Sequence, residues 1–411
     1  MLTVNVQRPA KKKSVFRRVS EWLHLWLGLF SAIIVFVVCL TGGLWVFRYE
    51  VYYFTEPYQR VDVQQKPYLL PSQLISLSLA HLTAHNDSGA VSGGVTYGKA
   101  GKSVICNFEL PGDKPALVYL NPYTGKILKV KREASGAEKF FIFVRAGHRF
   151  FWLPQKIGSP VVGAACIIFL ITLVTGLIWW YPQKWTKKTR DKSFKIKWNA
   201  KWKRLNIDLH NVLGFYSLVF IFILTVTGVV FTFDWFGNGV YKALTWKKRE
   251  IVKQYAPYSD TTLINKPLLV KPEDKIWNIA MQKHGERFGR MIISLPEKNK
   301  ETYEVDVFFG DGTLIYDRVS YFYDQYTLKS VKLNNDAGKP YQQLSTGEKL
   351  FKMNFDIHTG QILGLPTKIL AFIACIIGAS LPITGFIIWY NRKWGKKRVT
   401  VRKRAEILVK V

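Results

Sequence analysis

The chain has 411 residues, of which 48% are hydrophobic, and it carries a formal net charge of +31. Four nearly uncharged segments are each long enough to cross a hydrocarbon core as a helix, which takes about 20 residues: about 22–47, 157–181, 212–233 and 367–390. These spans exclude an ordinary soluble protein. The basic charge does not indicate nucleic-acid binding, because 25 of the 59 Lys and Arg lie in three short segments that flank the spans.

In chain order the sequence predicts alternating cytoplasmic, membrane and outer segments. The segments are a basic tail (1–19), a transmembrane helix (20–48), an outer module (49–140), a second transmembrane helix with an outer histidine segment (141–181), a basic loop (182–205), a third transmembrane helix (206–234), a second outer module (235–350), a fourth transmembrane helix with an outer histidine segment (351–391) and a basic tail (392–411). Short basic segments stay in the cytoplasm and suit an anionic leaflet, so both termini are predicted to be cytoplasmic. The first span lacks an A-x-A-like cleavage site and is predicted to be retained.

The chain repeats itself. His24, Gly28, Ser31, Thr41 and Gly42 recur 186 residues later, ending in Thr227 and Gly228, and the second and fourth spans share ACII, Thr-Gly, Trp-Tyr and Lys-Trp at an offset of 209. Such similarity in a fixed order predicts two related halves, each consisting of a span, an outer module and a span. Because both halves start on the same side, the repeats are predicted to be parallel. The expected fold is therefore a mainly α membrane protein with a four-helix transmembrane bundle and α+β outer modules.

Each outer module reads as a helix followed by short strands. In the first, a helix at 71–82 precedes strands at 93–98, 103–110, 115–120 and 127–133; in the second, a helix at 272–284 precedes strands at 290–296, 302–309, 320–326 and 328–333. The turn NPYTGK at 121–126 is echoed by DQYTLK at 324–329, where the glycine is missing. This pattern resembles the PepSY domain.

Four of the seven histidines border the spans. His24 and His210 begin the first and third spans at the predicted inner edge, whereas His148 and His358 precede the second and fourth at the outer edge. One interfacial histidine needs no function, but two symmetric pairs at membrane depth indicate one, because ionisable groups are costly there. The other three lie in polar helical parts of the outer modules and are predicted to be solvated surface residues: His81, His85 and His284.

The glycines around these histidines favour a flat cofactor. Gly28 and Gly214 lie one turn after an inner histidine, on the same stripe of the helix. The Thr-Gly pairs are predicted to face the histidine pairs and to leave slots for a ring edge, through Gly176 and Gly385 at the inner pair and Gly42 and Gly228 at the outer pair. Close helix packing explains glycine stripes equally well. Each histidine pair with its glycines would suit a b-type haem with two imidazole ligands.

Other ligands fit less well. Zinc prefers three or four protein ligands, and there is no H-E-x-x-H motif; copper favours added Cys or Met, and the chain has four of each. There is also no C-x-x-C-H motif for covalent haem. Arg145 and Arg149 flank His148 and could pair with haem propionates, or anchor the interface instead. Arg17 and Arg18 could do the same on the inner side, although the charge bias of cytoplasmic segments also explains them.

Two PepSY-like modules, four spans with LHxxLG and GHRFF-type histidines, and Thr-Gly before Trp/Tyr-rich span ends together resemble the PepSY-associated transmembrane proteins. This group includes iron-regulated inner-membrane ferric-siderophore reductases. The resemblance covers nearly the whole chain and implies two haems b, one on His24 and His210 and one on His148 and His358, that pass electrons outward. Two departures are the missing glycine of the second turn and Pro382 within the fourth span.

The resulting hypothesis is a bacterial inner-membrane dihaem protein that reduces a periplasmic ferric siderophore or other ferric chelate and so releases iron. The electron donor would be a quinol or a cytosolic flavin reductase, because the short cytoplasmic segments hold no flavin domain or G-x-G-x-x-G motif. Two alternatives remain: a PepSY-type protein that binds peptides or proteases without redox activity, and a haem or iron transporter. Haem content and its stability distinguish the three.

Overall fold

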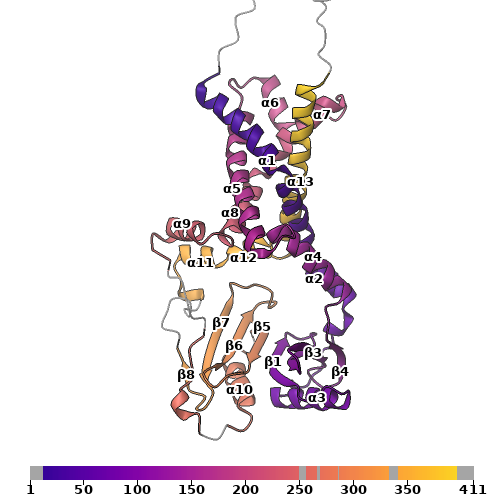
Figure 1. The fold of residues 1–411 in the computed structure, drawn as a ribbon, viewed down its shortest axis with the longest axis vertical. Helices are drawn as coiled ribbons and strands as arrows, with labels where there is room; N and C mark the ends of the chain where they lie inside the picture. Colours follow the sequence, from indigo (N-terminus) through magenta and orange to yellow (C-terminus); the bar gives the residue numbers. More distant parts are fainter. Residues whose placement is uncertain (1–12, 250–255, 266–268, 286, 333–340, 396–411) are drawn as a thin grey trace, which may run out of the picture. The chain divides into compact units, whose positions relative to one another are not determined.

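The computed structural model describes residues 13–249, 256–265, 269–285, 287–332 and 341–395. Two compact units share the chain (Figure 1). The helical unit comprises Met1–Gly43, Arg145–Thr232 and Leu370–Val411, and the sheet unit comprises Leu44–Val144 and Phe233–Ile369. The chain therefore passes between the units four times, and both units are assembled from segments that are distant in the sequence.

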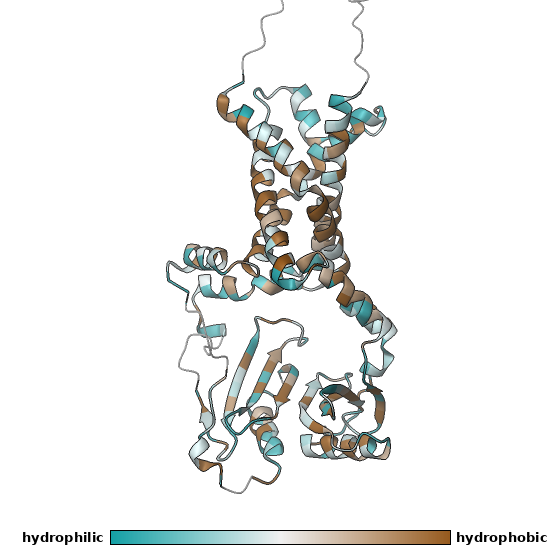
Figure 2. Cartoon of the chain, viewed as in Figure 1, coloured by the Kyte–Doolittle hydropathy of each residue, from teal (hydrophilic) through white to brown (hydrophobic). Residues whose placement is uncertain are grey.

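The helical unit contains the four predicted spans. They are α1 (Val15–Val46), α5 (Gln155–Trp180), the continuous run of α7 (Trp202–Asp208), η2 (Leu209–Leu213) and α8 (Gly214–Val230), and α13 (Leu365–Lys393). All four are long and apolar enough to cross a membrane, which confirms the prediction of four spans. Figure 2 shows that hydrophobic residues dominate the middle of these helices. The short helix α6 (Lys187–Phe194) lies in the basic loop between α5 and α7.

Small residues let α1 and α13 approach closely. A Cβ atom on Gly378 of α13 would lie 2.9 Å from the Sγ atom of Cys39 on α1, and one on Gly43 of α1 would lie 3.3 Å from Cβ of Cys375 on α13. Each thiol therefore packs where the other helix carries a glycine, as small residues do in membrane helix pairs. These cysteines act in packing, in agreement with the interpretation of span cysteines as small hydrophobic residues. α13 also continues through Pro382.

The sheet unit holds both α+β modules. The first contains α2 (Arg48–Thr55), η1 (Pro57–Gln59), α3 (Pro71–Ala84), β1 (Val91–Gly98), β2 (Val104–Leu110), β3 (Lys114–Leu120), β4 (Ile127–Lys131) and α4 (Gly136–Phe150), the last of which continues into the helical unit. The second contains α9 (Asp234–Thr245), η3 (Thr261–Leu263), α10 (Pro272–His284), β5 (Phe288–Ser294), β6 (Thr302–Phe309), β7 (Arg318–Asp324), β8 (Ser330–Val331), η5 (Tyr341–Gln343), α11 (Thr346–Lys352) and α12 (Asn354–His358). Both predicted helices and all predicted strands are present, although β8 is short and residue 333 lies outside the described residues.

The strands of both modules form one antiparallel sheet. Its order is β4-β3-β2-β1-β5-β6-β7-β8, so that each module contributes one half and β1 pairs with β5 at the centre. Along this pair Val95 lies opposite Ile293 and Tyr97 lies opposite Met291, and all four side chains are buried. The sequence predicted two separate meanders. It did not reveal their union, because periodicity within a strand does not identify the partner of an edge strand.

A buried carboxylate joins the two module helices. Asp274, in the first turn of α10, accepts hydrogen bonds from the backbone N–H (2.8 Å) and the hydroxyl (2.6 Å) of Ser72 in the first turn of α3. Both residues are buried beside the sheet core, which includes Leu74 and Ile276 from the same helices. Because buried polar groups need partners, this contact fixes how the helices meet.

The echoed turns adopt the same conformation with different residues. The Oδ1 atom of Asn121 accepts backbone hydrogen bonds from the residues two and three positions later, and Oδ1 of Asp324 does the same in the second module. Gly125 has φ = 71°, and Leu328 holds the equivalent position with φ = 54°. The second module therefore keeps the turn without the glycine, at the cost of a left-handed leucine.

Asp324 makes more hydrogen bonds than its counterpart. Its carboxylate also accepts bonds from the Thr327 hydroxyl (2.9 Å) and from the backbone N–H of Asp260 (2.6 Å). Burial alone would raise the pKa of Asp324, but these hydrogen bonds to the charged form outweigh it and hold the pKa below its usual value.

Candidate functional site

A cavity of about 470 Å³ lies among α1, α5, η2, α8 and α13 in the helical unit. His24 and His210 line it, together with four glycines of the predicted motifs: Gly28, Gly176, Gly214 and Gly385. The volume falls within the range of about 300–1,000 Å³ that is typical of cofactor and ligand clefts. The structure thus brings together the inner histidines and the inner glycines, as the sequence predicted.

His24 is held by α5. Its Nδ1 atom lies 2.9 Å from the Thr172 carbonyl oxygen, and its ring meets the Trp179 indole edge to face with centroids 5.4 Å apart. A Cβ atom on Gly176 would lie 2.8 Å from Cε1 of His24, closer than real Cβ contacts allow. Gly176 therefore makes room for the imidazole. The hydrogen bond fixes the ring and its tautomer, as a partner of a ligand histidine typically does.

His210 is held by α13 in the corresponding way. Its Nδ1 atom lies 2.9 Å from the hydroxyl of Thr384, and Asn206 donates a hydrogen bond to the Thr384 carbonyl at 3.0 Å. A Cβ atom on Gly385 would lie 3.3 Å from Cε1 of His210. His210 itself lies in η2, a single π-helical turn within the span. Such turns occur frequently at functional sites, because the extra residue rotates a side chain relative to the regular helix.

The two inner rings form a pair. Their centroids are 6.2 Å apart and their planes meet at 79°. Two imidazoles that bind one metal ion from opposite sides, each at about 2.0 Å, would have centroids roughly 6 Å apart. The contacts that hold the two rings use Nδ1 of each histidine. The Nε2 atoms of this pair are therefore the nitrogens that could bind a metal.

The glycines four residues after a histidine and the glycines of the Thr-Gly pairs have different neighbours. Gly28 and Gly214 border the cavity, and an added Cβ would lie 3.9 Å from Thr172 and 3.4 Å from Leu381, which is ordinary contact. Three glycines of the Thr-Gly pairs, Gly42, Gly176 and Gly385, in contrast lie directly against imidazole rings, where the sequence predicts the edge of a cofactor. In this structure the absent Cβ atom leaves the space that the imidazole ring occupies.

The outer histidines belong to different units. His148 lies in the part of α4 that belongs to the helical unit. Its Nδ1 atom is 2.9 Å from the Val38 carbonyl oxygen, and a Cβ atom on Gly42 would lie 2.9 Å from its Cε1 atom. His358 ends α12 in the sheet unit and is half-buried, and Gly228 is half-buried in α8. His148 thus shares the anchoring of the inner pair, and its pairing with His358 stays a prediction.

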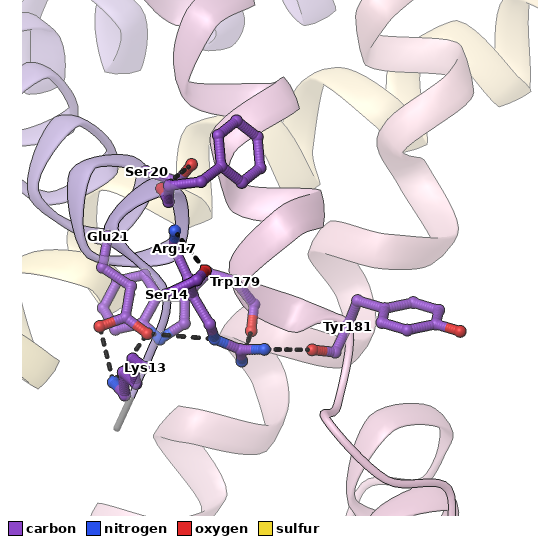
Figure 3. Close-up of polar contacts among 8 residues, drawn as sticks. Lys13, Ser14, Arg17, Ser20, Glu21, Trp179 and Tyr181 are labelled. Carbon is purple, nitrogen blue, oxygen red and sulfur yellow. Dashed lines mark hydrogen bonds and ion pairs between the residues drawn. The ribbon is translucent and has the colours of Figure 1, made fainter. Parts of the chain in front are cut away.

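The arginines differ from one another in their contacts. Arg145 and Arg149 are exposed on α4, and their pairing with propionates stays a prediction. Arg17 instead donates hydrogen bonds to the carbonyl oxygens of Trp179 (3.2 Å) and Tyr181 (3.1 Å), as Figure 3 shows, and lies 3.4 Å from Glu21. It satisfies carbonyls at the C-terminal end of α5 and does not line this cavity, and its pairing with a propionate stays a prediction.

Sequence reasoning missed two cations of the cavity. Arg392 and Lys393 line it at the end of α13, and they lie over the rings of Trp179 (5.3 Å) and Trp389 (5.6 Å), respectively. Their signal was the position of basic residues directly after Trp-Tyr at a span end. The sequence alone attributes these two cations to the charge bias of cytoplasmic segments. Among the described residues, no group of three or more His, Cys, Asp or Glu is arranged to hold a metal ion.

The fold and the cavity define a four-span membrane protein with two histidines facing one cavity in its helical unit and an antiparallel sheet in its second unit. A family model described as "PepSY-associated TM region" matches residues 21–392. The chain belongs to this family, as the resemblance indicated. A search of curated proteins found no match to the chain.

Proposed function

We propose that this protein carries electrons across the bacterial inner membrane to a periplasmic ferric chelate, such as a ferric siderophore, through two b-type haems. The observation that carries the proposal is the inner pair, in which His24 and His210 face one cavity with centroids 6.2 Å apart and both Nδ1 atoms anchored. The sequence resembles the group of proteins that includes ferric-siderophore reductases, and this resemblance supports ferric-chelate reduction as the reaction class.

The residues of the cavity suit a haem. Two neutral imidazoles offer one nitrogen each, as a b-type centre requires. Gly28 and Gly214 leave the walls beside the rings free of side chains, and the other lining groups are mostly aromatic or aliphatic. Arg392 and Lys393 supply the positive charge that two propionates need. A haem bound there would supply reversible one-electron transfer.

The chain's own residues would set the properties of this centre. Thr172 and Thr384 fix the ring orientations through Nδ1, and Gly176 and Gly385 allow both rings to approach their helices. The apolar bundle limits access of water, which tunes the potential of a buried centre. His148, anchored on Val38, would hold the second haem together with His358.

The proposed topology follows from charge. The basic segments would face the cytoplasm, so that the His24–His210 pair lies near the donor side and receives electrons from a quinol or a flavin reductase. The outer pair and the sheet unit would then face the periplasm. The two halves of the sheet, in mirrored strand order, support two parallel repeats of span, PepSY module and span. In the alternative functions, the modules bind peptides or proteases, or the bundle transports haem or iron.

Spectra of the purified protein test the proposal. We expect two low-spin b-type haems per chain. His24→Ala or His210→Ala should remove one haem and block reduction from the donor side while the other haem remains. His148→Ala or His358→Ala should keep donor-side reduction and abolish reduction of an external ferric chelate.

Other outcomes would favour the alternatives. A colourless protein would support a peptide-binding function, and substoichiometric haem that exchanges freely would support a transporter. Unchanged chelate reduction in the outer variants would refute the assignment of the outer pair. Loss of both haems from a single inner change would point to one shared site.

A further inference from the structure

Two histidines outside the bundle also form a pair. His81 lies in the last turn of α3, and His85 follows four residues later at the end of the helix. The sequence suggested solvated surface residues, and the structure does place them at the surface, with His81 half-buried and His85 exposed. Their rings, however, are only 4.1 Å apart between centroids and are inclined by 34°.

One ring is held in place by the backbone. The Nδ1 atom of His85 lies 2.7 Å from the carbonyl oxygen of His81, so its Nε2 atom is the nitrogen left for a ligand. This contact resembles the bond that orients a metal-binding histidine and fixes its tautomer. Residues four apart share one helix face, and two histidines at this spacing form the metal-binding face in other helices.

The ring separation indicates the coordination geometry. With a metal–nitrogen bond of about 2.0 Å, two imidazoles at a right angle around one ion would have centroids roughly 4.5 Å apart, and at a tetrahedral angle roughly 5 Å apart. The observed 4.1 Å is closer to the right angle. Neighbouring positions at a right angle are typical of tetragonal Cu²⁺ or Ni²⁺ sites rather than of zinc.

The surroundings tolerate a cation. The C-terminal end of a helix carries partial negative charge, and both imidazoles lie at the end of α3. Arg132, beyond β4, is a basic side chain whose charge acts on His81, and it forms an ion pair with Asp87, which offsets that charge. Solvent can complete the coordination, because His85 is exposed.

We propose that His81 and His85 form a surface site for a divalent first-row transition metal ion, and that Cu²⁺ binds most tightly in the usual order of stability. The two imidazoles supply the protein nitrogens and water supplies the remaining positions. The site is independent of the proposed haem pair, because it lies in the sheet unit and uses different histidines.

Titration of the full-length, tag-free protein in detergent with Cu²⁺ tests the site. We expect one equivalent to bind with an electron paramagnetic resonance spectrum that shows coupling to two protein nitrogens. His81→Ala and His85→Ala should each abolish this event, and His81→Gln should do so without loss of side-chain volume. The matched control is His284→Ala, since His284 ends α10 and its Nε2 atom is already 2.8 Å from the Tyr321 hydroxyl.

The result that overturns the proposal is Cu²⁺ binding by both alanine variants with the stoichiometry and spectrum of the parent. Loss of the bound equivalent in His24→Ala, with retention in His81→Ala, would overturn it too, because the ion would then bind in the bundle. Circular dichroism checks that the variants keep the parent's helix content. Alanine favours the helix at position 81, so its backbone should be unaffected.

Discussion

The two Thr-Gly glycines of the cavity predict different responses to one substitution. In Gly176→Ala the new methyl carbon would lie 2.8 Å from Cε1 and 3.1 Å from Nδ1 of His24. In Gly385→Ala it would lie 3.3 Å from Cε1 of His210. Ordinary contact begins at 3.4 Å. The first change therefore requires the imidazole to move by about 0.6 Å, and the second by about 0.1 Å.

The expected magnitude follows from the hydrogen bond that the movement breaks. The Nδ1 atom of His24 is 2.9 Å from the Thr172 carbonyl on the same helix as Gly176, so a displacement of about 0.6 Å away from α5 stretches this contact to the limit of hydrogen bonding. The loss is about 1 kcal/mol, which corresponds to about fivefold weaker binding of a cofactor that needs this ring orientation. Gly385→Ala should leave binding unchanged.

Haem titration of the detergent-solubilised protein, followed by absorbance, measures this difference. Both alanines favour the helical backbone by up to about 1 kcal/mol, so neither variant should unfold for local reasons. The reasoning is refuted if Gly385→Ala weakens haem binding as much as Gly176→Ala does, or if Gly176→Ala binds like the parent.

Three further predictions concern the cavity and the sheet unit. Because the inner imidazole planes meet at 79°, a haem bound by this pair should, when oxidised, give a strongly anisotropic low-spin resonance with one low-field feature; a rhombic spectrum with three resolved g values would contradict this geometry. Asp274→Ala leaves two buried donors of Ser72 without a partner and should lower the free energy of unfolding by about 3 kcal/mol, measured by circular dichroism, whereas the exposed Lys275→Ala should not. The pKa of Asp324 is lower in the folded than in the unfolded protein, where it is about 3.9, so this residue stabilises the fold above that pH and the stabilisation is lost as the pH falls through the folded pKa. Asp324→Asn should therefore flatten the decline of the unfolding midpoint between pH 6 and pH 3, and Asn121→Asp should steepen it. An equal acid slope in all three proteins would exclude the turn as the cause.

The elements were predictable from the sequence, and their assembly was predictable only in part. Long apolar segments identify membrane helices because lipid leaves few other solutions for a polar backbone. Alternating strands and the turns at Asn121 and Asp324 are local features as well. The pairing of β1 with β5 joins residues that are 192 to 200 positions apart in the chain, and no local pattern encodes it.

The residues of the inner site were predictable from the sequence, whereas some of their contacts were not. The recurrence of histidine with glycine four residues later indicated a paired site, and the structure places both histidines and all four inner glycines on one cavity. The sequence did not reveal that Gly176 and Gly385 accommodate the imidazoles. That contact crosses between helices, whereas spacing within one helix reports only on a shared face.

The two inner histidines differ in local helix geometry and in the groups that hold their rings. His24 lies in a regular α-helix, whereas His210 lies in η2, although both belong to the same repeated motif. The main-chain carbonyl of Thr172 holds His24, whereas His210 contacts the Thr384 hydroxyl as well as the backbone of Leu381. The Thr384 hydroxyl donates its own proton to the Ser380 carbonyl at 2.9 Å, so it is left to accept from His210, as the Thr172 carbonyl accepts from His24. Both contacts therefore require a proton on Nδ1 of the histidine. Both sequence-equivalent histidines therefore keep Nε2 free of the proton, and Thr384 is the side chain through which a substitution could alter the support of His210 without touching that of His24.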